Sequence, residues 1–242
     1  MASYDKRFSG RKFDDMREIE AKVGIIKRAD GSALFKIGDT IAIAAVYGPR
    51  ELHPRFLQNP ETGILRCNYD MTSFSVPERK RPGPNRRGVE ISLVTEKALL
   101  PVMELKQFAN SVVDVFIEIV QANAGTRCAG ISAAALALAH AGIPMKDLVA
   151  AISVGKVGGK VLIDLDKEEE DVEDATDIPI AMTGRKNEIT LLQLDGNLTK
   201  KELVEAMKLA KQGCEKINKI QQKALKDAYK SEVEWITNIY YH

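Results

Sequence analysis

The chain has 242 residues, of which 45% are hydrophobic, 35 are Lys or Arg and 34 are Asp or Glu. This length and apolar content suffice to bury a large core, in one domain or in two closely packed halves. The formal net charge of +1 excludes a uniformly basic coat that would bind polyanions indiscriminately. Any polyanion site must therefore be a local patch.

Cysteine usage and the amino-terminal residues indicate a cytoplasmic protein. Cys67, Cys128 and Cys214 form no CxxC pair, and their odd number suggests neither a disulfide framework nor a zinc cluster. The amino terminus carries charges where a signal peptide needs an apolar run, and no later stretch is apolar enough to span a bilayer. We therefore expect a soluble protein that is not exported and has no membrane partner.

The sequence pattern divides the chain into four parts. The first residues are polar and charged, which is typical of an arm that is ordered only against the body or a partner. Two strand-and-helix halves and a short tail follow. The boundaries are expected at 1–22 for the arm, 23–150 for the first half, 151–230 for the second half and 231–242 for the tail.

In the first half, strands are predicted at 32–37 and 40–47, because Gly38-Asp39 between them is typical of a tight hairpin. Residues 65–74 add an extended segment, and 77–87 break the regularity. Apolar residues at helical spacing then predict a short helix over 89–100.

A second strand-to-helix sequence follows in the same half. Alternating apolar residues predict a strand over 113–120 with at least one buried face. An alanine-rich helix is predicted over 128–141, where Gly142 and Pro144 end it. Residues 123–127 therefore form the turn between this strand and this helix.

The second half repeats the scheme loosely. A hairpin is predicted about Gly158-Gly159, strands at 178–182 and 189–194, and a long helix after Thr199, which begins a capping-box pattern with Glu202. We predict an α+β fold of two pseudo-repeated halves, in which helices pack on mixed β-sheets.

Gly125-Thr126-Arg127 is the first of three features that could carry chemistry. Free N–H groups at a helix start, a hydroxyl and a guanidinium can together surround a phosphate. A tripeptide of common residues at a turn is often only a loop and a cap. The residues alone leave both interpretations open.

The second feature is the run 78–87, which holds five cations. It is expected to form an exposed basic loop, and Arg86-Arg87 lead directly into the following helix. Such loops bind phosphodiester backbones through charge and bidentate guanidinium contacts. The alternative is a solvated run of charge without a ligand.

The third feature is the segment 164–177, which holds nine carboxylates. Asp171 and Asp177 lie just before the predicted strand 178–182. Such a pair could supply a general acid to a leaving oxygen and hold Mg²⁺ against phosphate oxygens. The alternative is an acidic loop that is merely solvated.

Other chemistries lose support. His53, His140 and His242 have no metal-ligand spacing. The sequence contains no G-x-S-x-G elbow, Walker loop or complete dinucleotide fingerprint, which argues against nucleophilic hydrolysis and cofactor chemistry.

The three features occur together in the order basic loop, Gly-Thr-Arg junction and paired aspartates, and here the chain closely resembles the RNase PH family. The resemblance runs from about residue 11 to about residue 229. Within the family, Glu51-Leu52-His53-Pro54-Arg55 is most similar to the active ring subunit of the archaeal exosome. The matching segments are Phe13-Asp14-Asp15-Met16-Arg17, Gly31-Ser32-Ala33, Val46-Tyr47-Gly48-Pro49, Met71-Thr72-Ser73-Phe74-Ser75, Glu90-Ile91, Gly125-Thr126-Arg127 and 171–177.

The resemblance implies a phosphate-dependent 3′ to 5′ exoribonuclease that releases nucleoside diphosphates and can also run in reverse. It further implies a ring of six RNase PH folds, in which this chain alternates with an inactive paralogue and RNA-binding cap proteins cover one face. Single-stranded RNA 3′ ends would enter the ring channel.

The resemblance also assigns roles to residues. Arg87, Gly125, Thr126 and Arg127 would bind the attacking inorganic phosphate, and Arg86 and Arg87 would grip the RNA backbone. Asp171 and Asp177 would handle proton transfer and hold Mg²⁺ or Mn²⁺. Arg55 would lie in a loop near the constriction of the channel.

Two alternatives remain open. A homohexameric RNase PH that trims tRNA 3′ ends shares the chemistry but not the partner. A noncatalytic RNA-binding ring subunit is an alternative of another class, and the intact aspartate pair argues against it.

Overall fold

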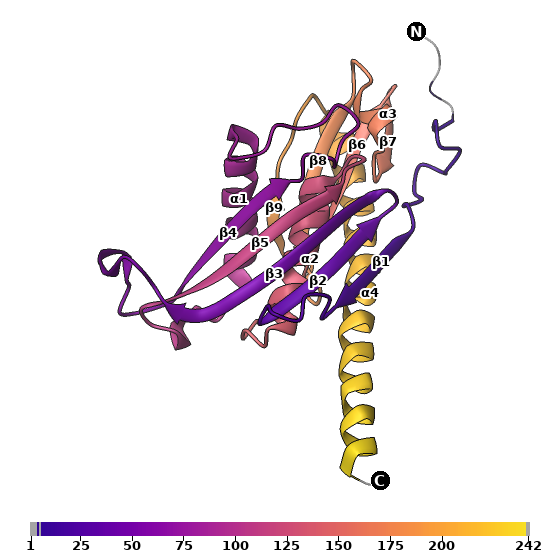
Figure 1. The fold of residues 1–242 in the computed structure, drawn as a ribbon. Coiled ribbons are helices and arrows are strands. Elements are labelled where there is room, and N and C mark those ends of the chain that lie inside the picture. Colours follow the sequence, from indigo (N-terminus) through magenta and orange to yellow (C-terminus); the bar gives the residue numbers. More distant parts are fainter. Residues whose placement is uncertain (1–3, 5, 241–242) are drawn as a thin grey trace.

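The computed structural model describes residue 4 and residues 6–240, of which 231–240 are described only as part of a helix. Within the described residues, the body consists of two sheets and four α-helices (Figure 1). In chain order the elements are β1 (Ile19–Val23), β2 (Gly31–Ile37), β3 (Thr40–Glu51), η1 (Arg55–Leu57), β4 (Ile64–Met71), α1 (Arg86–Leu99), η2 (Leu100–Val102), η3 (Leu105–Gln107), β5 (Ser111–Gln121), α2 (Thr126–His140), β6 (Val149–Val157), β7 (Lys160–Ile163), α3 (Lys167–Glu170), β8 (Thr176–Thr183), β9 (Ile189–Leu192) and α4 (Lys200–Tyr240).

The first sheet has the strand order β1-β2-β3-β5-β4. It is a mixed sheet, because β4 runs parallel to β5 while the other neighbours are antiparallel. The predicted hairpin at Gly38-Asp39 is confirmed, since Ile37 pairs with Thr40 across it. β5 lies between β3 and β4, so the strand that leads into the predicted phosphate-binding turn is supported on both sides.

The second sheet has the order β7-β6-β8-β9, and all its described pairs are antiparallel. Gly158 and Gly159 form the two-residue turn between β6 and β7, with φ values of 54° and 79°. Positive φ at both central positions is the signature of a hairpin turn that suits the twist of its strands. This predicted hairpin is therefore also confirmed.

Helix α2 lies between the two sheets and is buried on nearly all sides. Its small side chains let the strands approach closely, and a Cβ at Gly130 would lie 3.1 Å from the Ile117 side chain. A helix that is apolar all round is buried in a core, which explains its alanine-rich sequence. Residues of both sheets belong to one hydrophobic cluster. The predicted α+β layers of sheets and helices are confirmed.

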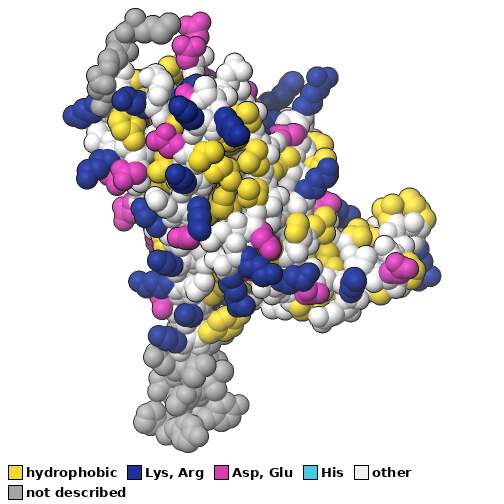
Figure 2. Space-filling view, turned by 180° about the vertical axis from the view of Figure 1, so that it is seen from behind, with side chains coloured by type: hydrophobic (Ala, Val, Ile, Leu, Met, Phe, Trp, Pro, Cys, Tyr) yellow, Lys and Arg dark blue, Asp and Glu magenta, His cyan; other side chains and the backbone are white. Residues whose placement is uncertain are grey.

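The other long helices cover the outer surfaces. α1 packs on β4 and touches β9, and α4 packs on β6 and β7 and against β1 (Figure 1). No helix among the described residues combines the length and the apolar character that crossing a membrane requires. Lys and Arg side chains are interspersed with Asp and Glu on the face in Figure 2, in keeping with the near-zero net charge.

Helix boundaries differ from the prediction at two places that matter for the site. α1 begins at Arg86, three residues before the predicted start, because the Asn85 side chain caps it by accepting the Gly88 N–H at 2.8 Å. The sequence pattern predicts no helix in the acidic segment 164–177. The segment contains α3, where Asp166 and Glu169 form a capping box.

The described residues before β1 and the last described turns of α4 lie outside the two sheets. β1 spans the expected boundary at residue 22, and the residues before it lie against the second half, where Arg7 is buried. The predicted tail begins inside α4, which continues to Tyr240, while 241–242 lie outside the described residues.

Candidate active site

The site begins at the turn that joins β5 to α2. Ala124 and Gly125 both have positive φ values, 59° and 64°, in a left-handed conformation that glycine adopts at little cost. Helix α2 then starts at Thr126, so the predicted strand-to-helix junction is confirmed. The first N–H groups of a helix have no intrahelical partner and carry partial positive charge. This junction therefore has the chemistry to bind an anion.

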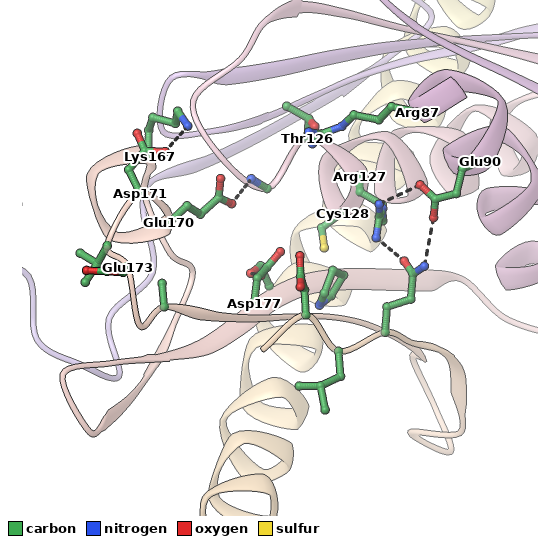
Figure 3. A pocket seen from close by; sticks show the side chains of 18 residues that line it. Arg87, Glu90, Thr126, Arg127, Cys128, Lys167, Glu170, Asp171, Glu173 and Asp177 are labelled. Carbon is green, nitrogen blue, oxygen red and sulfur yellow. Dashed lines mark hydrogen bonds and ion pairs between the residues drawn. The ribbon is translucent and has the colours of Figure 1, made fainter. Parts of the chain in front are cut away.

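A cavity of about 600 Å³ opens beside this turn (Figure 3). Its walls come from the starts of α1 and α2, from β6, from α3 and the segment after it, from β8 and from the segment after β9. The basic and acidic segments, which lie far apart in the sequence, thus form one pocket. Six of the eight predicted site residues line it: Arg87, Gly125, Thr126, Arg127, Asp171 and Asp177.

Arg127 is held by two neighbours from different elements. Its Nη2 donates to Glu90 Oε2 at 3.0 Å, and its Nη1 donates to Gln193 Oε1. Gln193 Nε2 in turn donates to Glu90 Oε1 at 3.1 Å, which closes a ring of three side chains (Figure 3). Arg127 Nε is buried and has no hydrogen-bond partner among the described residues. The contacts with Glu90 and Gln193 therefore fix the orientation of the guanidinium at the wall of the cavity.

Asp177 lies in β8 on the acidic side of the cavity. Its Oδ1 accepts a hydrogen bond from the Ser153 hydroxyl. Burial raises the pKa of Asp177, the Asp195 carboxylate adds to the effect, and the Ser153 hydrogen bond and Arg127 oppose it only in part. Asp177 therefore retains a proton more readily than an ordinary aspartate, as a general acid must.

Glu170 is a cavity residue that the sequence did not single out. The Gly125 N–H donates to Glu170 Oε1 at 3.4 Å (Figure 3). Burial, and then repulsion from the Asp177 carboxylate, raise the pKa of Glu170 to about 7. The Glu170 carboxylate lies against an N–H of the anion-binding turn, so a bound phosphate would have to displace it.

Asp171 differs from Asp177 in its surroundings. It caps the carboxyl end of α3, its side chain is exposed, and its Oδ1 accepts from Lys167 Nζ. It lines the same cavity from the rim formed by α3, across from Arg127 (Figure 3). The two predicted acids therefore share one pocket, with Asp177 deeper inside it.

Two predicted residues do not line this cavity. Arg86 opens α1 but lines a separate, largely apolar depression with Val89 and Leu93. Arg55 lies in η1, where its side chain is 80% exposed and pairs with Glu51. The connection that carries η1 projects from the body away from α3 (Figure 1).

Several residues of the site escaped sequence reasoning. The sequence around Glu170 contains a hint of its position, because the capping-box pattern of Asp166 and Glu169 predicts a helical turn, and Glu170 is the last residue of that turn. Ser153 and Gln193 had none, since each is an ordinary strand or loop residue that only the tertiary fold brings into the cavity.

The carboxylates of the site fit a divalent cation that is shared with a phosphate. Among the described residues, no group of three or more His, Cys, Asp or Glu side chains could hold a metal by itself. Mg²⁺, however, usually takes one or two carboxylates together with substrate phosphates and water. Burial and then repulsion from Asp177 raise the pKa of Glu170, and a cation between the two carboxylates would relieve the repulsion.

Comparison with known proteins adds the family. A model described as 3′ exoribonuclease family, domain 1, matches residues 15–144, and one described as domain 2 of that family matches 147–213. The Exosome complex component Rrp41 of Thermococcus gammatolerans is 53% identical over 224 residues, which cover 93% of this chain and 90% of that protein. The Pyrococcus furiosus component of the same name is 54% identical, covering 93% of this chain and 89% of the relative.

Solved structures show the same fold. Rice Rrp46 matches with a TM-score of 0.81 and 23% identity, covering 91% of this chain and 100% of the rice chain. A chain of the Archaeoglobus fulgidus exosome with RNA bound to the active site matches with a TM-score of 0.78 and 24% identity, covering 89% of this chain and 92% of that one. The two family matches together span nearly the whole body and the relatives are more than half identical, so the chain belongs to the 3′ exoribonuclease family typified by RNase PH.

Proposed function

We propose that this chain is the catalytic ring subunit of an archaeal exosome and degrades RNA from the 3′ end by phosphorolysis. One observation carries the proposal: a single cavity combines an anion-binding helix start and two arginines with a set of carboxylates of raised pKa. The names of the relatives and the RNA in the active site of the Archaeoglobus fulgidus exosome support it.

In the proposed reaction, an oxygen of inorganic phosphate attacks the phosphorus of the last phosphodiester. The bond from that phosphorus to the 3′ oxygen of the preceding nucleotide breaks, and this oxygen takes up a proton. The products are a nucleoside diphosphate and an RNA shorter by one nucleotide. Since a phosphate ester is exchanged for an anhydride of similar energy, the reverse reaction would tail RNA from diphosphates.

The chemistry requires two anions to approach each other. Arg87, Gly125, Thr126 and Arg127 would bind the phosphate through guanidinium groups, a hydroxyl and helix N–H donors, which offset the repulsion between the two anions. Arg86 and Arg87 would contact the RNA backbone near its 3′ end. Arg55 would contact the RNA farther from the reacting bond, along the part of the RNA strand that leads toward the cavity.

The carboxylates would act on the leaving group. Asp177, whose pKa is raised, would deliver the proton to the 3′ oxygen. Asp171 and Asp177 would also hold Mg²⁺ or Mn²⁺, which when bound neutralises charge on the phosphate oxygens.

The proposed assembly is a trimer of heterodimers with an inactive RNase PH-like paralogue, and RNA-binding cap proteins on one face. The relatives' name as exosome components and the similarity to rice Rrp46 support such partners. A homohexamer that trims tRNA is the second candidate, because it would use the same cavity. The size of the protein expressed alone separates the two.

The test is to identify the products from a 5′-labelled and an internally labelled RNA, with and without phosphate. The chain is assayed alone and together with the paralogue. We expect nucleoside diphosphates only when phosphate is supplied. Nucleoside monophosphates in phosphate-free buffer would mean hydrolysis, and the absence of any released nucleotide from the assembled ring would mean a noncatalytic subunit.

A further inference from the structure

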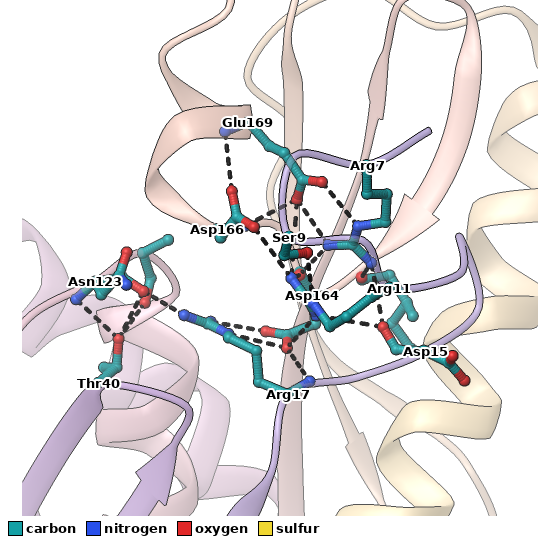
Figure 4. A network of polar contacts seen from close by, with 12 residues as sticks. Arg7, Ser9, Arg11, Asp15, Arg17, Thr40, Asn123, Asp164, Asp166 and Glu169 are labelled. Carbon is teal, nitrogen blue, oxygen red and sulfur yellow. Dashed lines mark hydrogen bonds and ion pairs between the residues drawn. The ribbon is translucent and has the colours of Figure 1, made fainter. Parts of the chain in front are cut away.

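Arg17 hydrogen-bonds to two segments that border the cavity, the turn before α2 and the start of the acidic segment (Figure 4). Its Nη1 donates to the carbonyl oxygen of Asn123, in the turn before α2. Its Nε and Nη2 donate to the two Asp164 carboxylate oxygens at 3.0 and 2.7 Å, at the start of the acidic segment. The Arg17 backbone N–H donates to Asp164 as well, at 2.7 Å. The two side chains are only 9% and 2% exposed, so the contact is shielded from water.

The phosphate-binding turn needs such support. Ala124 has a positive φ, a conformation that is unfavourable for a residue other than glycine and persists only when its surroundings hold it. The Thr40 hydroxyl contacts the carbonyl oxygens of Asn123 and Ala124 at 2.8 and 2.7 Å on one side. Arg17 also lies against this turn, since a Cβ at Gly125 would be 3.4 Å from its Nη2.

The acidic side is anchored by the same arm of the chain. Arg7 donates to both Glu169 carboxylate oxygens at 2.7 and 2.6 Å, which fixes the capping box of α3. Arg11 donates to Asp164 and Asp166 at 3.2 and 3.3 Å. Both contacts hold the helix that presents Glu170 to the cavity. Among the described residues, neither Arg7 nor Arg11 hydrogen-bonds to the turn before α2, whereas Arg17 bonds to both segments.

We propose that Arg17 is a positioning residue that sets the distance between the phosphate-binding turn and the catalytic carboxylates; this rests on the proposed function. A guanidinium suits the role because its planar fork donates in several fixed directions, which an ammonium group cannot do. A displacement of about 1 Å between reacting groups can cost about 100-fold in rate. A loosened turn weakens phosphate binding, and a shifted acidic segment slows proton transfer.

The test compares Arg17→Lys and Arg17→Ala with Arg11→Ala in the assembled ring. Arg11→Ala is the matched control, since it removes contacts to Asp164 without touching the turn. We expect both Arg17 variants to raise the KM for phosphate about tenfold and to lower kcat about tenfold or more, following the sensitivity of rate to placement. Arg11→Ala lowers the melting temperature but keeps the KM for phosphate within about twofold of wild type.

Arg17→Lys keeps a cation beside Asp164, so it carries the test if Arg17→Ala does not fold. If the Arg17 and Arg11 variants melt earlier to the same extent and share the wild-type KM for phosphate, Arg17 only stabilises the fold and the inference is wrong. A wild-type ring that releases no diphosphate with phosphate present instead overturns the proposed function, and the inference with it. The two failures are thus distinguished by the wild-type measurement.

Discussion

At the scale of single residues, Asp177 is the side chain whose surroundings most clearly serve a reaction. Burial raises its pKa, and Ser153 orients it. We expect Asp177→Asn to lower phosphate-dependent turnover about 100-fold or more, because a general acid contributes about 10²–10⁴-fold. Asp171→Asn should act in the same direction through loss of the proposed metal ligand. Product release under saturating RNA and phosphate measures both effects.

RNA binding should persist in these variants, since the arginines are untouched. Asp174→Asn is the control, because Asp174 is an exposed acid of the same segment that does not line the cavity. Normal turnover by both the Asp171 and Asp177 variants would contradict the assignment of the acids.

Asp114 shows what a buried carboxylate does for stability away from the site. Burial alone would raise the pKa of Asp114, but hydrogen bonds from Arg66 and Arg50 outweigh it, and the pKa lies below its ordinary value. A carboxyl group whose pKa is lower in the folded state stabilises the protein when the pH lies above its pKa in the unfolded chain, about 4. This stabilisation is lost as the pH falls through the folded-state pKa.

Asp114→Asn should therefore destabilise the protein by about 1 kcal/mol at pH 7, an amount kept small because both arginines are half exposed to water. The difference from wild type should shrink toward zero as the pH falls through the lowered folded-state pKa of Asp114. Denaturant titrations at several pH values measure it, with the exposed Glu61→Gln as control. A difference that stays constant down to low pH would mean that charge is not the cause.

At the scale of elements, the start of α1 departs from what favours a stable helix. Arg86 and Arg87 occupy its first turn, where the helix dipole disfavours a cation by about 0.3–1 kcal/mol. Lys97 lies in the last turn, where a cation is favoured. The placement of the two arginines is therefore better explained by binding an anion than by stability.

Replacing both Arg86 and Arg87 with Ala should weaken RNA binding and make its salt dependence shallower, because each lost phosphate contact removes about 0.7 from the slope of log K against log salt on single strands. The same variant should melt at the wild-type temperature or slightly above it. Lys97→Ala is the matched control and should show the reverse, a slightly lower melting temperature with unchanged RNA binding. An unchanged salt slope in the double variant would mean that these arginines are merely solvated.

The elements also show how far sequence reasoning reaches. Both hairpins were predicted correctly because Gly38-Asp39 and Gly158-Gly159 determine their turns locally. The start of α1 was predicted three residues too late, because the apolar pattern begins at Val89 while the Asn85 cap sets the real boundary. The Gly125 junction and the shared pocket followed from local turn chemistry and the family resemblance. The partners of Arg127 did not, since Glu90 and Gln193 are brought to it only by packing of α1 and the second sheet.

At the scale of the whole molecule, the two halves share one core. Helix α2 packs against both sheets, and a single hydrophobic cluster contains Cys67 of the first sheet, Cys128 of α2 and Cys214 of α4. All three thiols are free and buried. Burial raises the pKa of Cys214 to about 12 and raises those of Cys67 and Cys128 as well, so each thiol is unreactive until the surrounding structure opens.

This arrangement predicts that both halves unfold together, because opening either sheet exposes the apolar surface of α2. In pulse labelling with a thiol reagent at increasing denaturant, read out for each cysteine by mass spectrometry, the three labelling transitions should superimpose. Single Cys→Ser variants confirm the assignment of each labelled peptide, and the fully unfolded chain should label at all three positions. Labelling of Cys214 at a clearly lower denaturant concentration than Cys67 would instead mean that the second half opens by itself. The acidic side of the cavity could then separate from the proposed phosphate-binding turn without global unfolding.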